Sequence, residues 1–170
     1  MVVIGLFVKA DLENVAGVKV LPDHVWSLNL RESDGLEERK NVSLSAAEFA
    51  DTGNNRNSVN LCLNFKESRR KGTITIRSVK DVTRDFFPHE GDFSCVVAFD
   101  CRGVDILSWN PNGGYSVLCE SGNVIDDVLF EDGSWVGFDE VFYPFLSPSV
   151  QKSGNCVSVL NLDYELRVIP

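Results

Sequence analysis

The sequence has few cysteines and no segment long and apolar enough for a membrane span. Its 170 residues include five cysteines, and no two of them form a Cys-x-x-Cys pair. An odd cysteine count without a secretory leader argues against a disulfide-stabilised secreted domain. The opening apolar run, residues 2–8, is shorter than a signal core or a membrane span and has no basic leader before it. We therefore expect a cytoplasmic protein with reduced thiols and no membrane partner.

Positive charge is also scarce. The chain has 25 acidic and 16 basic residues, for a net charge of -9. No lysine or arginine lies between Arg102 and Lys152, where the acidic residues are Asp105, Glu120, Asp126, Asp127, Glu131, Asp132, Asp139 and Glu140. An acidic surface repels phosphate groups, so we expect no nucleic-acid partner. The acidic segment is either a solvated face or a site for a basic partner or a cation.

Side chains that commonly serve in catalysis are few. The two histidines, His24 and His89, are far apart in the sequence and lie beside acidic residues, which favours surface positions over a general-base role. The nucleophile motif Gly-x-Ser-x-Gly does not occur. We expect no catalytic residues, and we expect the protein not to be an enzyme.

The cysteines have the sequence context of structural residues. Cys95 and Cys101 lie on one face of a predicted strand but are about 20 Å apart, beyond the reach of a disulfide or a shared metal. We interpret both as small core residues. Cys119 and Cys156 lie in apolar surroundings without a neighbouring histidine, which argues against a catalytic thiolate.

Apolar and polar residues alternate along most of the chain, as they do in half-buried strands. The alternating runs cover residues 2–12, 26–30, 59–66, 73–77, 93–101 and 160–168. A helical signal is confined to residues 44–50, where Ser45 and Glu48 have the spacing of a capping box. The patterns predict an all-β fold of antiparallel sheets with at most one or two short helices.

Several short motifs carry a family resemblance over nearly the whole chain. They are Lys9-Ala10-Asp11-Leu12-Glu13-Asn14-Val15, Trp26, Phe99-Asp100-Cys101-Arg102-Gly103, Glu120-Ser121-Gly122, Asp127, and Trp135 with Phe138-Asp139-Glu140. In this order and spacing they resemble the eukaryotic CXXC-motif-containing zinc-binding protein family, a family of unknown function. The resemblance implies two β subdomains joined by long hairpins within one compact domain, 1–170. One subdomain, about 22–82, would carry the zinc hairpins, and the other would combine 1–21 with 83–170.

The chain departs from this family at the zinc site. Family members typically carry a Cys-x-x-Cys pair at each of two hairpin tips, and four thiolates at that spacing enclose one tetrahedral zinc. The resemblance places Glu32 and Gly35 at the first pair and Phe65 and Ser68 at the second. One carboxylate and one hydroxyl make a poor zinc cage. We therefore predict no metal and no cofactor at these degenerate positions, with strand pairing and burial of Phe65 holding the tips together.

An aromatic run follows the acidic segment. Phe142, Tyr143 and Phe145 lie close after Asp139 and Glu140. An aromatic patch rimmed by acids is typical of a protein-binding surface, although the same residues would also suit a cap on the core.

We interpret the chain as a non-enzymatic intracellular binding or adaptor protein of this family that has lost its zinc site. Its expected partner is a protein of unidentified kind. One alternative is a protein that binds zinc or another metal, or responds to thiol redox state, through a different site such as the acidic residues or Cys62. Another is an enzyme of unrecognised class, which would need a pocket joining a strongly perturbed titratable group to a partner.

Overall fold

The protein folds almost entirely into strands. The computed structural model describes residues 2–51, 58–87, 92–142, 145–146 and 152–170, and within them it contains thirteen strands and no helix. The strands are β1 (Val2–Glu13), β2 (Val15–Lys19), β3 (Val25–Glu32), β4 (Glu38–Ser45), β5 (Leu61–Asn64), β6 (Lys71–Arg77), β7 (Phe86–Phe87), β8 (Ser94–Arg102), β9 (Val104–Trp109), β10 (Tyr115–Cys119), β11 (Val124–Val128), β12 (Trp135–Phe142) and β13 (Lys152–Val168). No helix in the described residues has the length and apolarity needed to cross a membrane.

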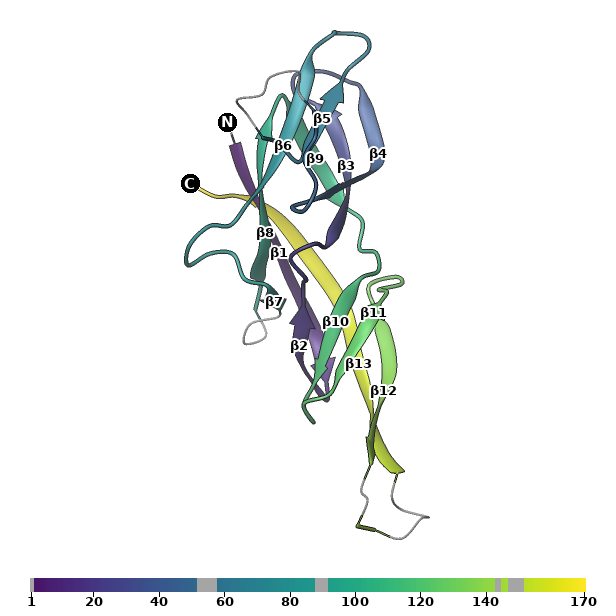
Figure 1. The fold of residues 1–170 in the computed structure, drawn as a ribbon. Coiled ribbons are helices and arrows are strands. Elements are labelled where there is room, and N and C mark those ends of the chain that lie inside the picture. Colours follow the sequence, from purple (N-terminus) through teal and green to yellow (C-terminus); the bar gives the residue numbers. More distant parts are fainter. Residues whose placement is uncertain (1, 52–57, 88–91, 143–144, 147–151) are drawn as a thin grey trace.

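The strands form three antiparallel sheets (Figure 1). The largest has the order β12-β13-β1-β8-β6-β5, the second β11-β10-β2-β7 and the third β4-β3-β9. Long β1 and β13 pair along the middle of the molecule, while β3, β4, β5, β6 and β9 gather at its upper end and β2, β10, β11 and β12 at its lower end (Figure 1). The prediction of an all-β antiparallel fold is confirmed.

The core follows from the alternation in the strands. Leu6 and Val8 of β1 are completely buried, and Trp26 of β3 packs edge-on against Phe99 of β8 with ring centroids 6.2 Å apart. Because β8 is a central strand of the large sheet, its polar residues are buried as well. Asp100, which the alternation places on an outer face, is 3% exposed and has the guanidinium of Arg77 at 3.3 Å.

The helix predicted at residues 44–50 is wrong. Leu44 is buried at the end of β4, where it pairs with Trp26 of β3. The hydroxyl of Ser45 accepts a hydrogen bond from the Ala47 amide at 3.2 Å, and the Glu48 amide donates to the Ser45 carbonyl at 3.2 Å. These bonds close a turn in place of a first helical turn, because strand pairing holds Leu44 extended.

Candidate functional site: two facing hairpin tips

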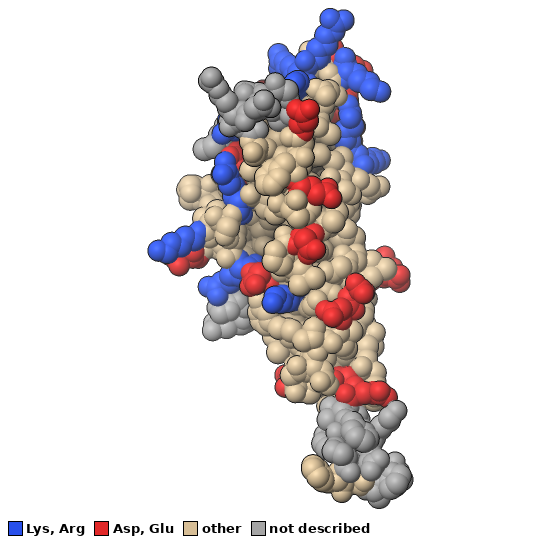
Figure 2. Space-filling model, viewed as in Figure 1, with Lys and Arg blue, Asp and Glu red and all other residues tan. Residues whose placement is uncertain are grey.

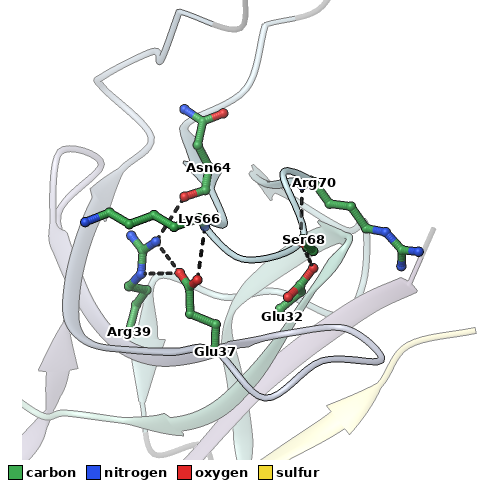
Figure 3. Close-up of polar contacts among 7 residues, drawn as sticks. All are labelled: Glu32, Glu37, Arg39, Asn64, Lys66, Ser68 and Arg70. Atoms are coloured by element: carbon green, nitrogen blue, oxygen red, sulfur yellow. Dashed lines mark hydrogen bonds and ion pairs between the residues drawn. The ribbon is translucent and has the colours of Figure 1, made fainter.

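Two hairpin tips lie at the upper end of the molecule (Figure 1), where they face each other (Figure 3). The first tip, residues 33–37, joins β3 to β4, and the second, residues 65–70, joins β5 to β6. The first turn closes through backbone bonds, since the Glu32 amide donates to the Glu37 carbonyl at 2.9 Å and the Gly35 amide to the Glu32 carbonyl at 3.1 Å. The two hairpins thereby bring together the four positions that the family resemblance assigns to cysteine.

Glu32 and Ser68 connect the two tips directly. Glu32 ends β3 and is 5% exposed, and the Ser68 hydroxyl donates a hydrogen bond to its carboxylate Oε1 (Figure 3). The Ser68 Oγ in turn accepts from the Arg70 amide at 3.2 Å, which fixes the hydroxyl within its own turn. A Cβ on Gly35 would lie 2.5 Å from Glu32 Oε2, so the carboxylate occupies the space that a side chain at residue 35 would need.

Phe65 fills the interior behind this contact. Its ring is 1% exposed, and its amide donates to the Arg70 carbonyl at 2.9 Å to close the second turn. A Cβ on Gly72 would lie 2.9 Å from the Phe65 Cε2 atom and 3.0 Å from the Val104 Cβ, so the ring packs against the backbone of β6 beside β9. Burial of a Phe side chain contributes about 1.5–3 kcal/mol.

Glu37 and Arg39 add two further links that the sequence analysis did not identify. The Glu37 carboxylate accepts from the Lys66 amide at 3.0 Å, and Arg39 donates to the Asn64 carbonyl at 2.9 Å (Figure 3). Arg39 also donates to Glu37 through Nε at 3.0 Å and through Nη2. Hydrogen bonding from the Arg39 side chain is the main reason why the pKa of Glu37 is lower than its usual value. The signal in the sequence is an acid and a base two residues apart, Glu37 at the end of the tip and Arg39 in β4.

These residues do not fit a zinc ion. Structural zinc sites use four ligands drawn mainly from thiolates and imidazoles. The four positions here supply one carboxylate and one hydroxyl, and these two groups bond to each other. Gly35 has no side chain and the Phe65 ring has no ligand atom. In the rest of the described structure, no three side chains of His, Cys, Asp or Glu gather into a group that could hold a metal.

The residues predicted to form a partner surface lie in different environments. Asp139 is buried, which corrects its assignment to a surface. Its carboxylate accepts hydrogen bonds from Ser121 at 2.6 Å and Asn123 at 2.7 Å, and these bonds lower its pKa. Glu140 is exposed and Phe145 is 98% exposed. Tyr143 and the side chain of Phe142 lie outside the described residues.

All five thiols are free, and three of them are buried. Burial raises the pKa of Cys95 to about 11 and that of Cys101 to about 12, so both stay protonated near neutral pH. The interpretation of these two as core residues is confirmed. Cys119 is the third buried thiol, whereas Cys156 is exposed and Cys62 has intermediate exposure.

The sequence and the fold match known proteins over nearly the full length. A UPF0587 protein of Dictyostelium discoideum is 29% identical over 137 residues, covering 80% of this chain and 85% of that protein. A UPF0587 protein of Nematostella vectensis is 30% identical over 143 residues, covering 82% and 89%.

Two solved structures share the fold. A hypothetical protein from Plasmodium falciparum has a TM-score of 0.80 at 22% identity, covering 98% of this chain and 100% of that one. The crystal structure of C1orf123 has a TM-score of 0.78 at 20% identity, covering 98% and 99%. The family model for the eukaryotic CXXC motif containing zinc binding protein matches residues 5–167. The protein therefore belongs to the eukaryotic CXXC-motif-containing zinc-binding family, a family of unknown function.

Proposed function

We propose that this protein is a non-enzymatic binding protein in which direct contacts between the hairpin tips replace the zinc ion of its family. The observation that carries this proposal is the hydrogen bond from Ser68 to the buried carboxylate of Glu32. Two positions that the family resemblance assigns to zinc ligands here satisfy each other. Because the Glu32 Oε1 atom accepts the Ser68 hydroxyl, it is less available to coordinate a metal.

The energetics support the same proposal. A hydrogen bond to an ionised group contributes about 1.5–3 kcal/mol, and burial of Phe65 adds about as much. A structural zinc contributes on the order of 10 kcal/mol, which is more than these contacts supply. However, a chain of 170 residues buries roughly 70% of its unfolded surface, so it does not need a metal in order to fold. The tip contacts therefore only have to fix the position of the tips.

A binding role fits the titratable groups better than catalysis does. A general acid or base needs a perturbed pKa together with access to a substrate. His24, whose pKa is lowered by burial, is enclosed by the rings of Trp26 and Tyr115 at centroid distances of 4.5 Å. The raised thiol pKa values of Cys95 and Cys101 belong to buried side chains. Reduced thiols support a cytoplasmic location as part of the proposal.

Elemental analysis of purified wild-type protein tests the zinc part directly. The matched control is the variant Glu32→Cys/Gly35→Cys/Phe65→Cys/Ser68→Cys, which restores four thiolates at the tips. We expect far less than one zinc per wild-type chain and about one zinc per chain of the variant, as a tetrahedral thiolate site requires. About one tightly held zinc in the wild-type protein would refute the proposal.

A further inference from the structure

The strand β12 leaves one edge of the large sheet open. In the described part of the chain, β12 pairs with β13 from Trp135 opposite Val159 to Phe142 opposite Lys152, and no strand pairs with its other side. The open edge of a strand presents amides and carbonyls to which an extended peptide can add as a further strand. On β12 the Glu140 carbonyl already accepts a hydrogen bond from the Asn123 side chain at 3.1 Å, so the added strand would pair with the rest of the edge.

The outward face of β12 carries apolar side chains. Val136 is 68% exposed and Phe138 is 54% exposed, and both lie on the face opposite the buried Asp139. Phe138 pairs with Cys156 of β13, which is also exposed. A Cβ on Gly154 would lie 2.5 Å from the Phe138 ring, so the ring rests on the backbone of β13. A surface of this kind is typical of a protein interface.

Acidic side chains surround the start of the same strand. A shallow groove there is lined by Asp127, Leu129, Glu131, Asp132, Ser134, Trp135 and Val136. Asp127, Glu131 and Asp132 are all exposed, and no basic residue occurs between Arg102 and Lys152. In the lower part of Figure 2 the charged side chains in view are acidic, whereas the basic ones lie at the upper end and along the middle of the molecule.

We propose that β12 binds an extended, lysine- or arginine-rich segment of a partner protein as an added strand. Apolar side chains of that segment cover Val136 and Phe138, and its cations lie in the acidic groove beside the indole of Trp135. A second copy of this chain, with its net charge of -9 and the same acidic edge, is repelled, as is a nucleic acid. This inference rests on the proposed function of protein binding and adds the chemistry of the partner.

The probe is a synthetic peptide as long as β12, eight residues, with alternating lysine and valine. Two control peptides keep its length. One replaces each lysine by glutamate, and the other keeps the lysines but carries methyl groups on alternate backbone amides, which removes the donors needed for strand addition. Binding is measured by fluorescence anisotropy, and the site is located from amide chemical shifts. We expect the lysine peptide alone to bind and to shift the amides of residues 135–142.

Protein variants test the groove. The variant Asp127→Asn/Glu131→Gln/Asp132→Asn removes three charges. Residues 127 and 132 have positive φ, and Asn tolerates this backbone conformation as Asp does. The matched control, Glu38→Gln/Glu48→Gln/Glu67→Gln, removes three exposed charges at the other end. We expect the first variant to weaken binding about tenfold, as for three exposed charge pairs, and the control to change it less than about twofold. Phe138→Thr should weaken binding as well.

Three results would overturn this inference: no binding of the lysine peptide, equal binding of the methylated peptide, or equal losses in the two triple variants. None of these results bears on the zinc content of the hairpin tips, so the zinc analysis tests the proposed function independently. A captured partner whose binding does not change in the groove variant would leave a binding role in place and remove β12 as its site.

Discussion

The hydroxyl of Ser68 donates to the carboxylate of Glu32 across 36 residues of sequence and between two different hairpins. Glu32 is 5% exposed, so water cannot replace this donor fully when it is lost. We expect Ser68→Ala to lower the free energy of unfolding by about 1–3 kcal/mol, because it leaves a buried carboxylate oxygen without its partner. Urea unfolding measures the change.

The control for this substitution is Ser43→Ala, at an exposed position of β4, which should change the free energy of unfolding by less than about 0.5 kcal/mol. Combining Ser68→Ala with Glu32→Gln should cost less than the sum of the two single losses, since they remove the same bond. Full additivity would show that Glu32 and Ser68 do not interact.

Phe65 provides the apolar part of the tip contact. Phe65→Ala should destabilise the protein by about 3–5 kcal/mol, because it empties a site packed against the backbone of β6. Phe49→Ala is the matched control, as Phe49 is 69% exposed and should cost little. Equal losses in the two variants, measured by urea unfolding, would contradict the packing described for Phe65.

The five thiols should differ in reactivity. In the native protein a thiol reagent should modify exposed Cys156 first, while Cys95, Cys101 and Cys119 stay unmodified until the chain unfolds. The raised pKa values of Cys95, about 11, and Cys101, about 12, reduce their thiolate fraction further. Cys156→Ser should abolish the fastest phase of the reaction. Persistence of that phase in the variant would place another thiol at the surface.

His24 should make stability depend on pH. The sequence favours a surface position for His24, but the structure buries it between Trp26 and Tyr115 with its Nε2 lacking a partner, and this burial lowers its pKa. Below the unfolded-state pKa of about 6.5, the unfolded chain binds a proton that the folded chain does not. The contribution of His24 to the free energy of unfolding is therefore fully present above about pH 6.5. As the pH drops toward the folded pKa, this contribution falls by at most about 1.4 kcal/mol per pH unit.

The comparison that isolates this effect is urea unfolding of wild type and His24→Phe at pH 7.5 and at lower pH. The gap in stability between the two proteins should change in favour of His24→Phe as the pH falls, since carboxylates contribute to both alike. A constant gap would mean that His24 titrates the same way in the folded and unfolded chains.

The strands were predictable because their signal is local. Alternation identified most of β1, β3, β6 and β8, and it also indicated the hairpin whose tip carries Ser68, while the family resemblance assigned Glu32 to the other tip. The 17-residue length of β13 was not evident, because a positive φ at Asn161 interrupts its alternation. The burial of Asp100 was also missed, since it depends on the place of β8 between β1 and β6, which come from distant parts of the chain.

The candidate site was predictable in its positions and not in its contacts. The family resemblance assigns Glu32, Gly35, Phe65 and Ser68 to the tips, but whether a carboxylate meets a hydroxyl depends on how two hairpins pack. The Glu37 bond to the Lys66 amide joins a side chain to a backbone group, and the sequence pattern contains no sign of such a bond. Asp139 was misplaced because its neighbours in sequence are exposed, whereas its partners, Ser121 and Asn123, come from another hairpin.

Amide hydrogen exchange at the tips, in the presence of a strong zinc chelator, tests the central claim most directly. The Lys66 amide donates to Glu37 and the Phe65 amide to the Arg70 carbonyl, so both should exchange slowly. If side chains and backbone bonds hold the tips together, their protection will be the same with and without the chelator. If chelation brings the Lys66 and Phe65 amides to the rate of an unstructured peptide, then a metal holds the tips and the account is wrong.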